Sequence, residues 1–215
     1  MIQAVIFDMD GLLIDSEVIS LAIYQNLLSR FGCSFTKETY AAHYSGRTEE
    51  ANVKRLLATY HLDWSFEQAL ENVYAEEAKL ISQGVALKSG AKELLEDLIS
   101  RQVAIGLATS SVKERALTIL NQHHLLPCFD QMVFGHEVEH GKPAPDIFIR
   151  ACEKLGFEPK ECLVLEDSES GVQAAHAAGV PVICVPDMKR PSSETLDKAL
   201  ATLDSLHEVR VFLNN

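Results

Sequence analysis

The sequence predicts an α/β fold in which a doubly wound parallel sheet carries an inserted, all-helical domain. Three observations support this prediction: short and continuously apolar runs, helical patterns between them, and one gap that is too long for an ordinary crossover. Continuous apolar runs favour a parallel sheet covered on both faces, because a strand with one exposed face would alternate apolar and polar residues.

Five runs are predicted to be strands, and they cover residues 4–7, 103–108, 132–134, 163–165 and 180–185. Between them, apolar residues recur at helical spacing, as in Ala91, Leu94, Leu95 and Leu98. The stretch after Pro191 is predicted to form one or two surface helices.

The gap between the first two predicted strands is the anomaly. It extends from Asp8 to Val103, roughly 95 residues, whereas a parallel crossover needs about a dozen. Its pattern is helical throughout, and its first apolar face is formed by Ile19, Ile23, Leu27 and Phe31. We therefore predict a helical domain over residues 16–84, inserted into a core domain of residues 1–15 and 85–215.

Composition excludes several function classes. The chain has 215 residues and a formal net charge of −12, which disfavours nucleic acid and anionic membrane surfaces as partners. The apolar runs are far shorter than a membrane span, and the first residues lack the basic region of a signal peptide. Five widely spaced cysteines without a CxxC pair suit reduced thiols, so we expect a cytoplasmic protein, and nothing requires more than a monomer.

Polar groups follow the predicted strands where those strands end. Asp8 and Asp10 come directly after the first strand, and Thr109-Ser110 comes after the second. In open α/β sheets this carboxyl edge is where ligands bind. Each motif alone has a simpler interpretation, since Asp-x-Asp-Gly is frequent in turns and Thr-Ser-Ser is a common helix cap.

Two further motifs strengthen the functional interpretation. Lys142 lies in the loop after the 132–134 strand, and Glu166-Asp167 ends the 163–165 strand. A lone loop lysine is usually solvated, but buried strands rarely end in two acids without a cation or another partner. Together these motifs predict four acids, a hydroxyl and a lysine at one edge of the sheet.

The four motifs in this order closely resemble the haloacid-dehalogenase superfamily of phosphotransfer enzymes. The segment from Lys142 to Asp146, Lys-Pro-Ala-Pro-Asp, and the Glu-Asp-Ser that begins at Glu166 resemble the branch with β-phosphoglucomutase and small phosphatases. The inserted helical region is similar to that superfamily's cap domain in position and size.

The resemblance implies a role for each acid. Asp8 would attack phosphorus and form an aspartyl-phosphate, and Asp10 would be the general acid and base. Mg²⁺ would be held by Asp8, the backbone carbonyl of Asp10 and Asp167. Glu166 would either bind the ion through a water molecule or support the residues that bind it.

The resemblance also implies substrate contacts. Thr109, the backbone of Ser110 and the ammonium of Lys142 would hold phosphoryl oxygens. Gly46 and Arg47 match the cap loop that faces substrate, although a solvated surface arginine is an equally good interpretation of Arg47.

We therefore expect a Mg²⁺-dependent phosphatase that hydrolyses a small phosphorylated metabolite, either a sugar phosphate or a nucleoside monophosphate. A phosphohexomutase of the β-phosphoglucomutase type is the alternative, but Ser20 stands where that enzyme has a histidine.

Asp10 disfavours dehalogenase and phosphonatase activities, because the enzymes with these activities lack an aspartate at this position. A receiver domain would be about 90 residues shorter, and a binding module without activity would be expected to have lost one of the acids.

Overall fold

The computed structural model describes residues 2–214, which form two compact units. Residues 16–85 form the helical unit, and residues 2–15 with residues 86–214 form the core unit. Residues 1 and 215, which the sequence analysis assigns to the core domain, lie outside the described residues. The chain thus leaves the core unit after Asp15 and returns to it at Ala86.

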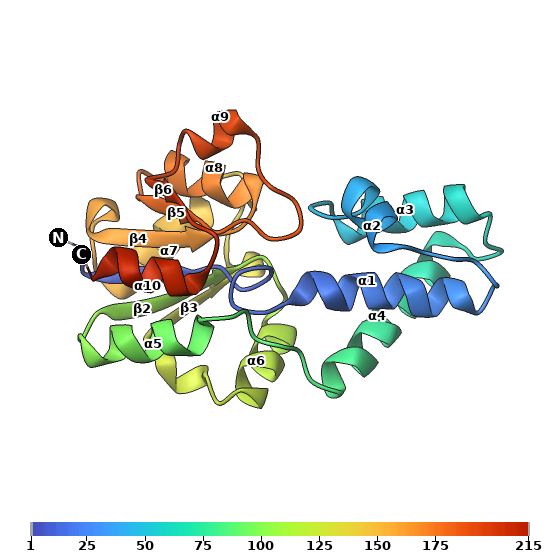
Figure 1. Cartoon of the computed structure of the whole chain (residues 1–215), viewed down its shortest axis with the longest axis horizontal. Coiled ribbons are helices and arrows are strands. Elements are labelled where there is room, and N and C mark those ends of the chain that lie inside the picture. Colours follow the sequence, from blue (N-terminus) through green and yellow to red (C-terminus); the bar gives the residue numbers. More distant parts are fainter. Residues whose placement is uncertain (1, 215) are drawn as a thin grey trace. The chain divides into compact units, whose positions relative to one another are not determined.

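The core unit is built on one sheet with the strand order β3-β2-β1-β4-β5-β6, in which every pair is parallel (Figure 1). Its strands are β1 (Ala4–Phe7), β2 (Ala104–Thr109), β3 (Gln131–Phe134), β4 (Cys162–Glu166), β5 (Val182–Cys184) and β6 (Ala201–Thr202). From β1 the chain runs to β2 and β3, and then returns to the other side of β1 with β4. The predicted doubly wound fold is confirmed, and the strand order reverses between β1 and β4.

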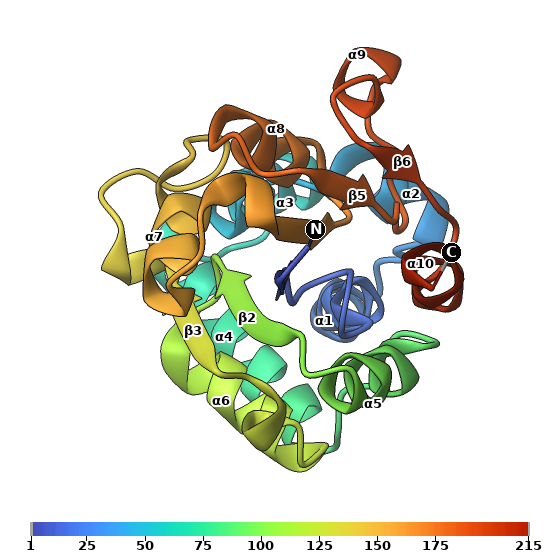
Figure 2. The same ribbon diagram turned by 90° about the vertical axis from the view of Figure 1, so that its left-hand side faces the viewer.

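Helices cover both faces of this sheet (Figure 2). On one face lie α7 (Asp146–Leu155) and α8 (Glu169–Ala177), and on the other lie α5 (Ala91–Ser100), α6 (Lys113–Gln122) and α10 (Leu206–Leu213). Ile6 and Val164 are buried in one cluster with residues of α7 and α8. Phe7, the next residue of β1 after Ile6, points to the opposite face of the sheet and packs edge-on against Phe129, with ring centroids 6.4 Å apart. Strands buried on both sides have no polar face, which explains their continuous apolar runs.

The end of the chain differs from the prediction of one or two surface helices by one additional strand. It contains the short helix α9 (Ser193–Leu196), then β6, and then α10. α10 is a surface helix, as predicted, and its inner face packs against α5 and buries Leu206 and Val209. The strand was missed because two residues at a sheet edge carry no apolar run. Short 3₁₀ helices occupy three other connections, at Leu126–Cys128, Gly135–Glu137 and Pro159–Glu161.

The helical unit contains α1 (Ser16–Ser29), α2 (Lys37–His43), α3 (Glu49–Tyr60) and α4 (Phe66–Ser82). α1 and α3 both pack against α4. The side-chain oxygens of Thr36, Thr48 and Ser65 accept backbone hydrogen bonds that begin α2, α3 and α4.

One residue of the predicted first apolar face was assigned wrongly. Phe31 lies beyond the end of α1, is exposed, and packs edge-on against Trp64, with ring centroids 5.0 Å apart. Among the described residues, no helix is long and apolar enough to cross a membrane.

Candidate active site

The predicted site residues of the core unit lie at the carboxyl edge of the sheet. Asp8 follows β1, Thr109 ends β2, and Glu166 ends β4. Because Phe7 is in register with both Leu107 and Leu165, the residues that follow them emerge at the same height. This edge is also where the strand order reverses, which is the usual ligand crevice of a doubly wound sheet.

Lys142 joins two of these strand ends. It comes from the loop before α7, and its ammonium forms ion pairs with Asp8 and with Glu166, the latter at 2.6 Å. The lysine side chain is only 7% exposed. Burial would lower the pKa of Lys142, but the negative charges and hydrogen bonds of Asp8 and Glu166 outweigh burial and raise it. The lysine therefore supplies a fixed positive charge inside the site.

Glu166 is bound at both of its oxygens. Oε1 accepts the hydrogen bond from Lys142. Oε2 accepts from the backbone N–H groups of Asp167 and Ser168 and from the Ser168 hydroxyl, each at 2.9 Å. The side chain is 1% exposed. With its oxygens engaged in this way, Glu166 serves best as an anchor for Lys142 and for the turn into α8.

Two glycines make room for the acids. A Cβ atom on Gly171 would lie 1.7 Å from Glu166 Oε1, so the first turn of α8 requires a glycine there. Gly11 has a φ of +78°, and a Cβ atom on it would lie 2.3 Å from Asp167 Oδ2. The backbone approaches the acids this closely only where no side chain intervenes.

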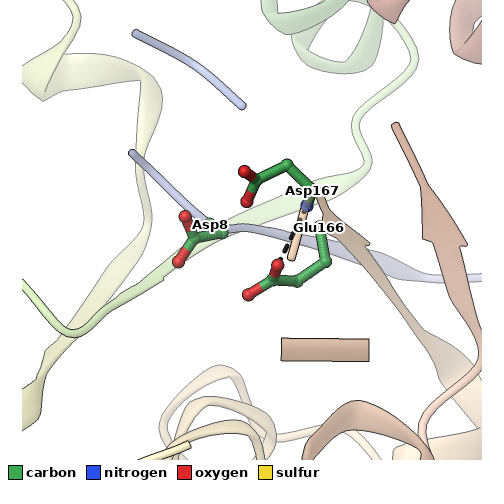
Figure 3. A group of neighbouring side chains, drawn as sticks. All are labelled: Asp8, Glu166 and Asp167. Carbon is green, nitrogen blue, oxygen red and sulfur yellow. Dashed lines mark hydrogen bonds between the residues drawn. The ribbon is translucent and has the colours of Figure 1, made fainter. Parts of the chain in front are cut away.

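Asp8, Glu166 and Asp167 form an acidic cluster in which one ligand atom from each lies within 4.8 Å of the others. Figure 3 shows Glu166 and Asp167 projecting from adjacent positions of the chain, with Asp8 beside them. Burial, followed by the charges of Glu166 and Asp8, raises the pKa of Asp167. Burial also raises the pKa of Asp8, because it outweighs the effect of Lys142 and Glu166 adds to it.

This cluster fits a divalent cation. Three carboxylates face one ammonium, so two negative charges remain unbalanced when every group is ionised. The donors are all carboxylate oxygens, which hard cations such as Mg²⁺ and Ca²⁺ prefer. Since Glu166 is already engaged, Asp8 and Asp167 are the carboxylates that can face the ion.

Asp10 follows Asp8 by two residues, and its carboxylate is held by Ser111 and Arg115 and not by the acidic cluster. Its Oδ2 accepts a 2.6 Å hydrogen bond from the Ser111 hydroxyl, and Arg115 lies 2.9 Å from Oδ1 and 3.0 Å from Oδ2. The Thr109 hydroxyl oxygen accepts from the Ser111 backbone N–H at 3.1 Å, and Ser110 is exposed. Neighbouring groups at the end of β2 thus hold Asp10 and line the predicted phosphate loop.

Gly46 and Arg47 lie in the helical unit, in the exposed turn between α2 and α3. Gly46 has a φ of +70°, which favours glycine, and Thr48 caps the following helix. The turn is therefore well defined by its own sequence.

Sequence reasoning missed two charged residues of the site. Arg115 contacts Asp10 from the first turn of α6. Asp187 follows β5, where Lys88 binds its Oδ1 at 2.6 Å, and its Oδ2 is buried without a hydrogen-bond partner among the described residues. The rule that polar groups follow strand ends would have found Asp187, since the predicted fifth strand stops two residues before it. No spacing rule would have found Arg115.

Comparisons with known proteins agree with this geometry. Residues 5–185 match the family model described as haloacid dehalogenase-like hydrolase. A phosphorylated carbohydrates phosphatase of Thermotoga maritima is 34% identical over 178 residues, which are 83% of this chain and 82% of that protein. A Drosophila melanogaster protein with the provisional name pseudouridine-5′-phosphatase is 35% identical, over 95% of this chain and 90% of its own.

A solved structure gives the same result for the fold. A Thermotoga maritima protein, provisionally assigned as a β-phosphoglucomutase, superimposes with a TM-score of 0.87 and 31% identity over 99% of both chains. The family model covers most of this chain, and the curated relatives match it over most of their own length. This protein therefore belongs to the haloacid dehalogenase-like hydrolase family, as its four motifs predicted.

Proposed function

We propose that this protein is a Mg²⁺-dependent phosphatase that hydrolyses a small phosphate monoester through an aspartyl-phosphate on Asp8. The observation that carries the proposal is the buried Lys142, which is ion-paired with both Asp8 and Glu166 beside Asp167. A carboxylate is a weak nucleophile, so its attack on phosphorus requires positive charge around the phosphoryl group. Lys142 provides such charge from the protein itself.

The first half-reaction transfers the phosphoryl group to Asp8. Lys142 holds Oδ1 of Asp8, which leaves Oδ2 as the attacking atom. A bond forms between Oδ2 and phosphorus while the bond from phosphorus to the substrate oxygen breaks. Asp10 donates a proton to that departing oxygen, and the alcohol leaves.

The second half-reaction returns Asp8 to its starting state. Asp10, now a carboxylate, takes a proton from water as the water oxygen attacks phosphorus. The bond between phosphorus and Asp8 breaks, and inorganic phosphate is released. One residue thus acts first as acid and then as base.

The oxygens of the transferred group are held by the end of β2 and by Lys142. The Thr109 hydroxyl oxygen accepts a hydrogen bond from the Ser111 backbone N–H, and a hydroxyl that accepts can also donate its own proton to a phosphoryl oxygen. The exposed Ser110 backbone N–H and the Lys142 ammonium supply the other donors. Asp8, Asp167 and the backbone carbonyl of Asp10 would hold Mg²⁺, which neutralises phosphoryl charge when bound.

The substrate class follows from the relatives and from the chain's second unit. The similar proteins named above are phosphatases of phosphorylated carbohydrates and, provisionally, of pseudouridine-5′-phosphate. This supports a sugar phosphate or a nucleoside monophosphate as substrate. In this proposal residues 16–84 act as the cap, and Gly46-Arg47 contacts the part of the substrate beyond the phosphate.

We also propose that the protein acts as a monomer in the cytoplasm, with a small phosphorylated metabolite as its partner and without nucleic acid or membrane. All five cysteines are free, which agrees with a reducing compartment. The net charge of −12 agrees with the exclusion of polyanions.

The test is phosphate release from a panel of sugar phosphates and nucleoside monophosphates, with Mg²⁺ and with EDTA. We expect metal-dependent release that Asp8→Asn abolishes while the protein stays folded. Release that continues in Asp8→Asn, or that EDTA leaves unchanged, would contradict the mechanism.

A mutase remains the second candidate because of the likeness to the provisionally assigned β-phosphoglucomutase. A mutase transfers the phosphoryl group back to a sugar and requires a sugar bisphosphate to prime Asp8. Turnover of β-glucose 1-phosphate that starts only after addition of a bisphosphate would favour the mutase. Phosphate release without any primer would favour the phosphatase.

A further inference from the structure

The carboxylate of Asp10 is held by a compact set of donors outside the acidic cluster. Arg115 Nη1 lies 2.9 Å from Oδ1 and 3.0 Å from Oδ2, and the Ser111 hydroxyl donates to Oδ2 at 2.6 Å. Arg115 Nη1 also donates to Ser111 Oγ at 2.7 Å. The arginine side chain is 15% exposed and the Asp10 side chain 33%, so water weakens this ion pair less than it weakens one on the open surface.

This set of donors is fixed by the backbone around it. Ser111 lies just before α6 and Arg115 in its first turn, and the two side chains are in direct contact. The Ser111 backbone N–H donates to the hydroxyl oxygen of the buried Thr109, so the serine is tied to the end of β2. The position of Asp10 is therefore coupled to the loop that is proposed to bind phosphate.

We infer that Arg115 is the positioning residue for Asp10 and acts together with Ser111, a role that rests on the proposed phosphatase function. The ionised Asp10 that pairs with Arg115 is the form that acts as base, and a base must come within about 2.6–3.2 Å of the water that it deprotonates. An aspartate free to change its side-chain rotamer would spend much of its time away from that position. Contacts from Arg115 to both oxygens restrict this motion.

The neighbouring cluster gives a second reason for such restraint. Asp10 is two residues from Asp8, and the carboxylates of Asp8 and Asp167 are the proposed direct ligands of the cation. A cation there would attract any unrestrained carboxylate nearby, and Asp10 would then lose its proton-transfer role. The ion pair with Arg115 holds the Asp10 carboxylate beside Ser111, at the end of β2 where phosphate is proposed to bind.

The first test is the kinetic effect of Arg115→Met. We expect kcat on the best sugar phosphate of the panel to fall about 10- to 100-fold, part of the 10²- to 10⁴-fold that acid–base catalysis supplies. We expect KM to change by less than about threefold, because Arg115 acts through Asp10 and not on the substrate. Arg115→Lys, which keeps the charge but loses the two-oxygen contact, should recover part of the loss.

The second test uses p-nitrophenyl phosphate, whose leaving group departs without a proton from Asp10. Formation of the aspartyl-phosphate should then remain fast in Arg115→Met, while its hydrolysis, which needs Asp10 as base, becomes slow. Rapid mixing should therefore reveal a burst of p-nitrophenolate followed by a slower steady state. A merely structural loss would reduce both phases together.

A double-mutant cycle decides whether Arg115 acts through Asp10. In the Asp10→Asn background, Arg115→Met should change kcat by less than about twofold. Two independent effects that multiply would overturn the inference, as would an unchanged kcat in Arg115→Met alone. Ser111→Ala provides a second variant with a smaller expected loss, so the test stands even if Arg115→Met folds poorly.

The matched control is Arg150→Met, which removes an exposed arginine that pairs with Glu153 on α7. Its kcat and thermal unfolding should match those of the unsubstituted protein. Failure of this inference is distinct from failure of the proposed function. Absence of phosphatase activity in the unsubstituted protein refutes the function, whereas an active enzyme indifferent to Arg115→Met refutes only the role of Arg115.

Discussion

Glu166 illustrates how one buried residue organises the candidate site. Its two oxygens accept from Lys142, from two backbone N–H groups and from a hydroxyl, and it is closed in by the first turn of α8. A buried carboxylate with all of these partners is held rigidly, because loss of any partner leaves buried charge unpaired. Its role is to fix Lys142, which in turn fixes Asp8.

Gly171 offers a test of this arrangement. Helix propensity alone predicts that Gly171→Ala would stabilise α8 by up to about 1 kcal/mol. The structure predicts the opposite sign, because the new methyl group would lie 1.7 Å from Glu166 Oε1 and would displace that side chain. We expect Gly171→Ala to lower the free energy of unfolding by about 1–3 kcal/mol in urea titrations and to reduce phosphatase activity.

Gly141→Ala is the matched control for that substitution. No atom lies within 4 Å of the position of its added Cβ, and its φ lies outside the left-handed region. Its unfolding midpoint should stay close to that of the unsubstituted protein. A stabilised and fully active Gly171→Ala variant would show that Glu166 can move without consequence.

At the scale of residues, the sequence predicts the site residues that lie at strand ends and misses a site residue that comes from a neighbouring helix. Asp8, Thr109 and Glu166 follow apolar runs, so a strand-end rule finds them. Arg115 reaches Asp10 from the next helix across 105 positions of sequence, and such a contact depends on how α6 packs. Side-chain reach of this kind has no signature in a linear pattern.

At the scale of elements, α8 is tied to α9 through one carboxylate. Glu169 accepts from the backbone N–H and hydroxyl of Ser192, at 2.8 and 2.7 Å, and from the Thr195 hydroxyl at 2.6 Å. These hydrogen bonds, led by that of Thr195, lower the pKa of Glu169 to about 2. The ionised carboxylate therefore fixes the short α9 against the start of α8.

This lowered pKa predicts a pH-dependent contribution to stability. Because the folded pKa of about 2 lies below the ordinary value of 4.5, the contribution is present above pH 4.5 and is lost as pH falls toward 2. We expect Glu169→Gln to lower the free energy of unfolding at pH 7 by about 1 kcal/mol, a modest value because the group is partly exposed. Urea titrations at several pH values should show this difference shrinking in acid.

Glu194→Gln, a nearby exposed acid in the first turn of α9, is the control and should show little effect at any pH. A Glu169→Gln deficit that stayed constant down to pH 2 would mean that the charge of Glu169 contributes nothing.

The prediction of elements succeeded where burial leaves a strong pattern. Each of the five longer strands lies within two residues of its predicted bounds, since strands covered on both faces are apolar throughout. The helices after Pro191 were predicted, but the two-residue β6 lies at the edge of the sheet and carries no local pattern. Pairing with β5 defines this strand.

At the scale of the whole molecule, the net charge opposes the proposed substrate. A charge of −12 repels phosphate esters at long range, so attraction must come from groups close to the reacting phosphorus. The described core unit provides one such group in the buried Lys142. The remaining acids of the cluster could hold a divalent cation, which would add positive charge at the same place.

Asp167 links the proposed cation site to the stability of the fold. Its pKa is raised above 3.8, first by burial and then by Glu166 and Asp8. A raised folded pKa means that ionisation of Asp167 opposes folding, so without a cation its cost grows as pH rises from the ordinary value of 3.8 toward the raised folded pKa. A bound cation reverses this effect, because it interacts favourably with the ionised form.

Asp167→Asn should therefore change stability in opposite directions with and without metal. In EDTA at pH 8, we expect the variant to unfold at a higher urea concentration than the unsubstituted protein, because the variant lacks the carboxyl whose ionisation opposes folding. With Mg²⁺ at about 100 times its Kd, the unsubstituted protein should gain about 2.7 kcal/mol, and the variant should gain much less and become the less stable of the two. Asp204→Asn, an exposed acid of the same unit, should follow the unsubstituted protein in both conditions. If Asp167→Asn were destabilised in EDTA as well, Asp167 would be acting as a structural hydrogen-bond acceptor, and the cluster would not be organised around a cation.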